Sequence, residues 1–285
     1  FVLTRHEQGA AHMADGYARA ARRPGIVMSQ AIGASNVAAG LRDAFLGCSP
    51  VIAITGGPAT ATRYRGLYQE VEDFAMFGPL TKWNARLEVC EQLPGMLAHA
   101  FRVATSGTPG PVHVEVGGRI GDALDREADL PLRVDGRFAC CPPTRPVPEL
   151  ESVGEALRAI ADAKRPVLVA GGGVIASGAE REVIAFAERH SLPVIPTLSG
   201  KSAVPDNHPL CAGVSGTYGR WCANTLLAES DLVVWVGSRA GGMVTDIWKA
   251  PKPGTPGVYF DIDSTAVGRD YPAAAIVVGD ARASL

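Results

Sequence analysis

Residues 51–55 read Val-Ile-Ala-Ile-Thr, a short run that is apolar on both alternating faces. A strand of this kind is typical of a parallel sheet buried on both sides, because an exposed face would carry polar residues at every second position. Runs of the same kind occur at residues 26–29 and 112–116. The intervening sequence predicts helices over 8–22, 36–47 and 91–106. Alternation of strands and helices predicts a parallel sheet with helices on both faces.

A second series of the same type follows a break in the pattern. The predicted linker, residues 126–147, is rich in proline and charge, which favours an extended surface segment. Beyond it we predict helices at 150–163, 179–190 and 219–229, and strands at 167–170, 194–197, 232–236 and 258–262. The predicted fold class is α/β, with two doubly wound domains of mainly parallel sheet covered by helices. We place the domains at residues 1–125 and 148–285.

Composition narrows the class of protein. The 285 residues suffice for two domains, and 47% hydrophobic with 20% charged residues is typical of globular proteins. A net charge of -2 favours neither nucleic acid nor an anionic membrane as partner. No apolar run reaches the roughly 18 residues that a membrane span needs. The six cysteines show no metal-ligand spacing, so we expect free thiols and a cytoplasmic location.

The two ends of the sequence suggest part of a longer protein. The chain begins with an apolar, strand-like segment, Phe1-Val2-Leu3, without an initiator methionine. It ends at Ala283-Ser284-Leu285, which resembles the start of a helix. We therefore expect a fragment whose first domain is incomplete at its amino end.

The run Arg5–Arg19, RHEQGAAHMADGYAR, is the first candidate functional stretch. Its glycines and alanines would let a second helix or a flat ligand approach the backbone closely. We expect Glu7 to lie where a strand passes into a helix, at the sheet edge where open α/β folds bind ligands. An ordinary role is also open, since an acid in the first turn is stabilised by the helix dipole.

This run closely resembles the pyrimidine-binding domain of thiamine diphosphate (ThDP) enzymes of the acetolactate synthase and 2-oxoacid decarboxylase type. Further blocks match that domain in the same order and at similar spacing. They lie at residues 29–36, 43–45, 49–56, 68–70, 81–82 and 106–112.

The resemblance implies roles for four residues. Glu7 would be the carboxylate that activates the cofactor by sharing a proton with its aminopyrimidine, and burial would raise its pKa for that purpose. Gln69 would face substrate or cofactor, although an exposed loop position is an equal alternative. Gly33 and Asn36 would lie in a loop facing the cofactor, with Asn36 available to cap the next helix. Glu7 and Gln69 are thus the catalytic candidates.

The second series resembles the central domain of the same enzymes, which in acetolactate synthases binds FAD. A strand, a glycine-rich turn and a helix could cradle a pyrophosphate, but a triple glycine can equally form a tight turn against neighbouring backbone. Candidate FAD or ADP contacts are Gly171, Gly172, Gly173, Thr197, Gly237, Arg239 and Asp261.

Several departures from the family pattern keep the substrate and the flavin open. Thr108 stands where the synthases carry an FAD-contacting arginine, and Gly117-Gly118 replaces a Pro-Lys pair. The Gly-Asp-Gly motif and following Asn, which hold the diphosphate and Mg²⁺ in a third domain, are not found. No metal ligand is therefore assigned here, and we expect the 285 residues alone to bind ThDP poorly.

The expected activity is acetolactate synthase-like carbon–carbon bond formation from 2-oxoacids, in a homodimer or homotetramer with the active site at the subunit interface. A 2-oxoacid or 2-oxoacyl-CoA decarboxylase or lyase is the alternative within the family. Outside it, an FAD- or NAD-dependent oxidoreductase or a non-catalytic binding module remains open.

Overall fold

The computed structural model describes residues 1–118, 129–132 and 135–285. The chain divides into two compact units, Phe1–Thr144 and Arg145–Leu285. The start of the predicted linker lies outside the described residues. Its later part forms a short 3₁₀ helix, η4 (Gly136–Ala139), where Phe138 packs beneath the Arg102 guanidinium of the first unit.

The first unit contains a parallel sheet of order β1-β2-β4-β3. Its strands are β1 (Gly25–Ser29), β2 (Val51–Pro58), β3 (Asn84–Leu87) and β4 (Val112–Gly118). The helices are α1 (Glu7–Ala21), α2 (Ala34–Leu46) and α3 (Leu93–Thr105). Three 3₁₀ segments connect them: η1 (Ala31–Gly33), η2 (Phe74–Leu80) and η3 (Cys90–Gln92).

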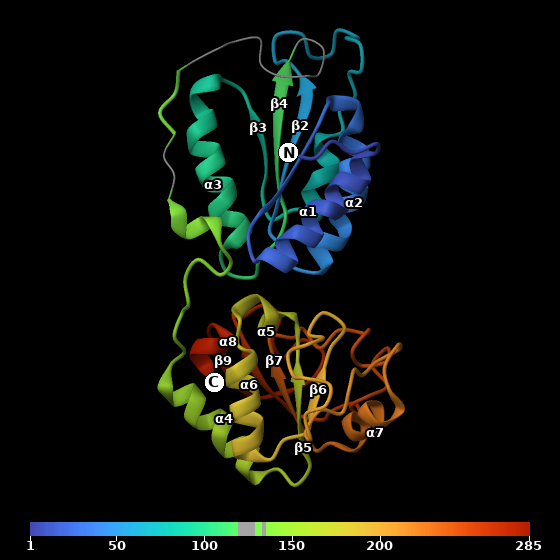
Figure 1. Cartoon of the computed structure of the whole chain (residues 1–285), viewed down its shortest axis with the longest axis vertical. Helices are drawn as coiled ribbons and strands as arrows, with labels where there is room; N and C mark the ends of the chain where they lie inside the picture. Colours follow the sequence, from blue (N-terminus) through green and yellow to red (C-terminus); the bar gives the residue numbers. More distant parts are fainter. Residues whose placement is uncertain (119–128, 133–134) are drawn as a thin grey trace. The chain divides into compact units, whose positions relative to one another are not determined.

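Helices cover both faces of this sheet (Figure 1). Helices α1 and α2 pack with Val27, Val51 and Ala53 on one face. Helix α3 packs with Ile52 and Val112 on the other. Successive residues of a strand point to opposite faces, so a strand covered on both sides must be apolar throughout.

Small residues set the distance between α1 and α2. A Cβ built on Gly40 would lie 2.6 Å from the Cβ of Ala11 and 3.0 Å from the carbonyl oxygen of Gln8. Ala11, Ala14 and Ala18 are all buried in this contact. The small-residue face of the RHEQGAAHMADGYAR run therefore receives a helix and not a flat ligand.

The second unit contains a parallel sheet of order β6-β5-β7-β8-β9 (Figure 1). Its strands are β5 (Pro166–Ala170), β6 (Val194–Pro196), β7 (Leu232–Val236), β8 (Gly257–Asp261) and β9 (Ala273–Val278). The helices are α4 (Leu150–Asp162), α5 (Gly172–Ser177), α6 (Glu180–His190), α7 (Trp221–Glu229) and α8 (Ala281–Ser284).

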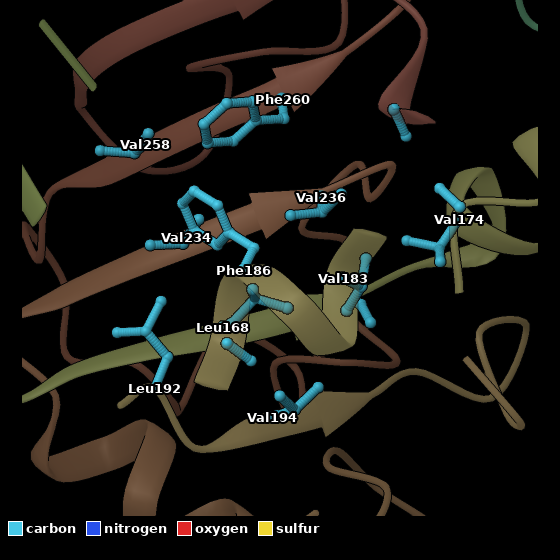
Figure 2. Packing of buried hydrophobic residues seen from close by; sticks show 14 of the residues in the cluster. Leu168, Val174, Val183, Phe186, Leu192, Val194, Val234, Val236, Val258 and Phe260 are labelled. Atoms are coloured by element: carbon cyan, nitrogen blue, oxygen red, sulfur yellow. The ribbon is translucent and has the colours of Figure 1, made fainter. Parts of the chain in front are cut away.

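Two hydrophobic clusters lie on the two faces of the second sheet. Figure 2 shows one of them, in which Phe186 and Val183 of α6 pack against Leu168, Val234 and Phe260. On the other face, Trp235 and Tyr259 pack with Leu227 of α7. The predicted fold class, mainly parallel sheets covered by helices, is confirmed.

The predicted strand character of Phe1–Leu3 is wrong. These residues are irregular, and their side chains are exposed. In the part of the chain that the structure describes, no strand precedes Glu7. Within the same ranges, no helix combines the length and the apolar character needed to cross a bilayer.

Candidate active site

Glu7 is the first residue of α1. His6 caps the helix, because its backbone is extended and its Nδ1 accepts a hydrogen bond from Gln8 N at 3.2 Å. Glu7 therefore occupies the first turn, where free backbone N–H groups favour a negative charge. The expected strand before it is missing, so another part of the fold must bring Glu7 to the sheet edge.

The turn that follows β1 supplies this placement. Asn36 Nδ2 donates to Glu7 Oε2 at 3.1 Å. Gly33 lies against the same carboxylate, since a Cβ built on it would be 2.7 Å from Oε1. Gly33 and Asn36 come directly after β1, so Glu7 lies at the carboxyl end of a parallel strand, although α1 itself follows none.

The electrostatics of Glu7 differ from the expectation. Its pKa is lowered, first by a hydrogen bond from its own backbone N–H and then by the Asn36 amide. The carboxylate is only partly buried, so desolvation is too weak to raise the pKa. In the chain as described, Glu7 is therefore an anion at neutral pH.

Asn36 does not cap the helix. Helix α2 begins at Ala34 with Gly33 as its N-cap, which places Asn36 inside the first turn. Its side-chain amide is thereby directed to Glu7. The sequence brings together three of the four predicted ThDP-side residues.

Gln69, the fourth, lies in the connection between β2 and η2. Its backbone is left-handed, with φ 61°, which is uncommon for a residue with a side chain. Among the described residues, its buried Oε1 has no hydrogen-bond partner. A buried acceptor without a donor is costly, and such atoms in native structures often mark a ligand site.

The connection around Gln69 is folded about a carboxylate that sequence reasoning missed. The Glu70 side chain accepts hydrogen bonds from the backbone N–H groups of Tyr64 and Leu67. These contacts lower the pKa of Glu70. We call residues 64–73 the Gln69 segment. Since β1 and β2 are parallel neighbours, this segment and the Glu7 turn leave the sheet at the same edge.

A buried polar chain crosses the sheet below this edge. His113 of β4 lies between Thr55 Oγ1 at 2.8 Å from Nε2 and Asn84 Oδ1 at 2.7 Å from Nδ1. Its ring stacks on Phe77 with centroids 3.5 Å apart. Asn84 Nδ2 donates to the Phe74 carbonyl, which turns Asn84 Oδ1 toward the histidine. Nδ1 therefore carries the proton, and Nε2 accepts from Thr55.

The triple glycine of the second unit packs against backbone. Gly171 N donates to Val236 O at 2.8 Å, and Gly173 N donates to Gly237 O at 3.0 Å. A Cβ on Gly171 would lie 2.1 Å from Gly237 O. Two of the three amides are thus engaged within the fold, and Gly172 faces Ser199. This geometry fits the tight-turn alternative better than an open pyrophosphate cradle.

The other central-domain candidates gather at the same sheet edge. Thr197, Arg239 and Asp261 follow or end β6, β7 and β8, and these strands pair in parallel with or through β5. Thr197 Oγ1 accepts from Gly200 N, and the buried Asp261 carboxylate accepts from Asp263 N. Burial raises the pKa of Asp261.

Within the described ranges, no group of three His, Cys, Asp or Glu side chains could hold a metal ion. Cys140 and Cys141 are neighbours in sequence, but Cys140 is exposed and Cys141 is buried. All six cysteines are free.

Known proteins give the same domain order. Residues 1–76 match the thiamine pyrophosphate enzyme N-terminal TPP binding domain, and residues 153–285 match the thiamine pyrophosphate enzyme central domain. The chain is 37% identical over 289 residues to the probable acetolactate synthase large subunit of Methanocaldococcus jannaschii, covering 99% of this chain and 48% of that protein. It is 36% identical over 286 residues to the acetolactate synthase large subunit of Corynebacterium glutamicum, covering 99% and 44%.

Solved structures share the fold. A candidate thiamin diphosphate-dependent enzyme from Mycobacterium smegmatis superposes with a TM-score of 0.79 at 27% identity, over 99% of this chain and 54% of that one. Benzoylformate decarboxylase from Polynucleobacter necessarius gives 0.78 at 24% identity, over 99% and 52%. The chain spans about half the length of the curated relatives it matches. With the N-terminal and central domain models matched in order along it, the chain belongs to the thiamine pyrophosphate enzymes.

Proposed function

We propose that Glu7 binds the aminopyrimidine of ThDP in an enzyme that forms or cleaves carbon–carbon bonds of 2-oxoacids. The observation that carries the proposal is the contact between Glu7, Gly33 and Asn36 at the carboxyl end of β1. Asn36 occupies Oε2, and the lack of a side chain at Gly33 leaves Oε1 approachable. The residues present therefore fit a flat, hydrogen-bonding ring.

Bound ThDP supplies a carbon nucleophile and an electron sink. Glu7 holds or moves a proton at Oε1, where it faces a nitrogen of the ring. Asn36 keeps the carboxylate in one orientation, which avoids an ordering cost when the ring binds. Covering the site would remove water from Glu7 and raise the pKa that is low in the uncovered chain.

The first choice of reaction is acetolactate synthase-like ligation of two 2-oxoacids. The similarity to acetolactate synthase large subunits over 99% of this chain supports it. Simple 2-oxoacid decarboxylation is the alternative, and product analysis separates the two.

Further features of the whole protein are proposed on the same family basis. Mg²⁺ and the diphosphate need ligands beyond those seen here, and a second subunit in a homodimer or homotetramer would complete the site. FAD in the central domain is a weaker proposal, because Gly171 and Gly173 use their amides internally. Six free thiols support a cytoplasmic location.

Glu7→Gln in the full-length protein tests the assignment. We expect turnover of pyruvate to fall about 10²- to 10⁴-fold, the usual contribution of a proton-transferring side chain, while the melting temperature changes little. Glu151→Gln is the matched control, because Glu151 is the exposed first-turn acid of α4. If Glu7→Gln and Glu151→Gln were equally active, Glu7 would be an ordinary helix-start acid.

A further inference from the structure

We propose that Arg86 is a positioning residue that holds the Gln69 segment at the cofactor edge of the first sheet. The inference rests on the proposed function, since it assigns a role to the surroundings of Gln69. The Arg86 guanidinium contacts Glu115 of β4, Glu72 of the Gln69 segment and the ring of Phe74. One side chain thus joins the rigid sheet to both sides of the Gln69–η2 connection.

The sheet side of this connection is deeply buried. Arg86 and Glu115 are directly opposite in the β3–β4 register, and Arg86 Nε donates to Glu115 Oε1. The Glu115 side chain is 1% exposed. Its room comes from β2, since a Cβ on Gly57 would lie 2.4 Å from the Glu115 carboxyl carbon. A carboxylate enclosed in this way needs a cation, and Arg86 supplies it in a fixed orientation.

The other side of the connection reaches the Gln69 segment. Arg86 Nη2 donates to Glu72 Oε1, three residues beyond Gln69. The guanidinium carbon also lies 4.4 Å from the centre of the Phe74 ring, the first residue of η2. Arg63 approaches the same carboxylate, with Nε 4.0 Å from Glu72 Oε2. Glu72 is therefore the point where the segment is attached to the sheet.

A tether at this place has a consequence for Gln69. The left-handed backbone of Gln69 and its unpaired, buried Oε1 are both unfavourable in isolation. Such a conformation persists only when its surroundings over-determine it. Glu70 fixes the inside of the segment, and the Arg86–Glu72 pair fixes its end against β3. Release of the Arg86 contact would allow Gln69 to relax away from the site.

A double-mutant cycle distinguishes positioning from general stabilisation. In the full-length enzyme, Arg86→Met should lower kcat/KM by about 10²-fold, as expected for a misplaced site group. In a Gln69→Ala background the same change should lower it less than twofold, because no side chain remains to be positioned. Arg86→Lys should recover part of the loss. If the two changes multiply, Arg86 does not act through Gln69 and the inference is overturned.

Arg137→Met is the matched control. Arg137 also pairs with a carboxylate, Asp135, and lies over an aromatic ring, Phe138, but it does not contact the Gln69 segment. It should leave kcat/KM within twofold. If Arg86→Met fails to fold, Glu72→Gln provides the same cycle, because it leaves the buried Arg86–Glu115 pair intact.

Amide hydrogen exchange gives a readout that needs no turnover. Arg86→Met should speed exchange in peptides from residues 64–73 and leave α1 protected. Absence of turnover in the unmodified protein with every 2-oxoacid would count against the proposed function alone. Unchanged exchange in residues 64–73 would overturn the tether, whatever the activity.

Discussion

Asn36 donates a hydrogen bond to Glu7 across 29 positions of sequence, and the two residues belong to different helices. The position of the proposed activating acid therefore depends on the turn after β1 as much as on α1. Gly33, at the start of that turn's helix, makes the contact possible.

Gly33→Ala should act almost as Glu7→Gln does. The backbone of Gly33, with φ -86° and ψ -6°, suits alanine, but the added methyl group would lie 2.7 to 2.8 Å from the Glu7 carboxyl group. We expect Glu7 to be displaced and turnover to fall at least about 10²-fold, with ThDP affinity measured by calorimetry falling in parallel. Gly9→Ala is the control, since a Cβ there meets nothing within 4 Å. Equal activity of the two variants would contradict the close packing of Gly33 and Glu7.

His113 should make the first unit less stable in acid. Burial lowers the pKa of His113 from 6.5 to about 3. Below 6.5 the unfolded chain takes up a proton that the folded chain refuses, so the free energy of unfolding falls by about 1.4 kcal/mol per pH unit until about pH 3. Above 6.5 this contribution is constant.

His113→Gln isolates that effect. The variant should be less stable at pH 7, because it loses the ring stacked on Phe77, but its stability should depend less on pH between 6.5 and 4. Amide exchange in β2 and β4, corrected for the intrinsic pH dependence, measures the difference. Carboxyl groups with raised pKa values, such as Glu115, are common to both proteins and cancel. Parallel pH profiles would show that His113 is not the titrating group.

Gly173→Ala should destabilise the second unit. The new Cβ would lie 2.7 Å from the Cα of Gly237, and backbone on both sides leaves little room to yield. Overpacking of this kind costs about 1–3 kcal/mol. Gly241→Ala is the comparison, because a Cβ at Gly241 meets nothing within 4 Å. Urea unfolding of both variants provides the test, and equal midpoints would argue against the Gly173–Gly237 contact.

The fold class follows from the sequence because the buried strands are apolar throughout. Strand β3 escaped prediction because two of its four residues, Asn84 and Arg86, are polar, and their partners His113 and Glu115 become visible only when the register is known. Strand β9 begins with three alanines, which carry little strand preference. Helix α5 begins with two glycines, which are poor helix formers.

The site was predictable in composition and less so in geometry. Glu7, Gly33 and Asn36 do meet, but the sequence could not show that Asn36 points to Glu7 instead of capping α2. Nor could an apolar pattern show whether any partner covers Phe1–Leu3, which is why the strand prediction failed. The lowered pKa of Glu7 depends on local donors and on exposure, and neither is written in the motif.

The separate attachment of Glu7 and Gln69 has a consequence for engineering. Glu7 is fixed by the turn after β1, and Gln69 by a connection after β2 that is anchored on β3. Substrate preference could then be exchanged between relatives by transplanting the second connection, without altering the acid. A transplant of this kind would need to carry Arg86 and Glu115 along with the loop, or the new loop would arrive without its anchor.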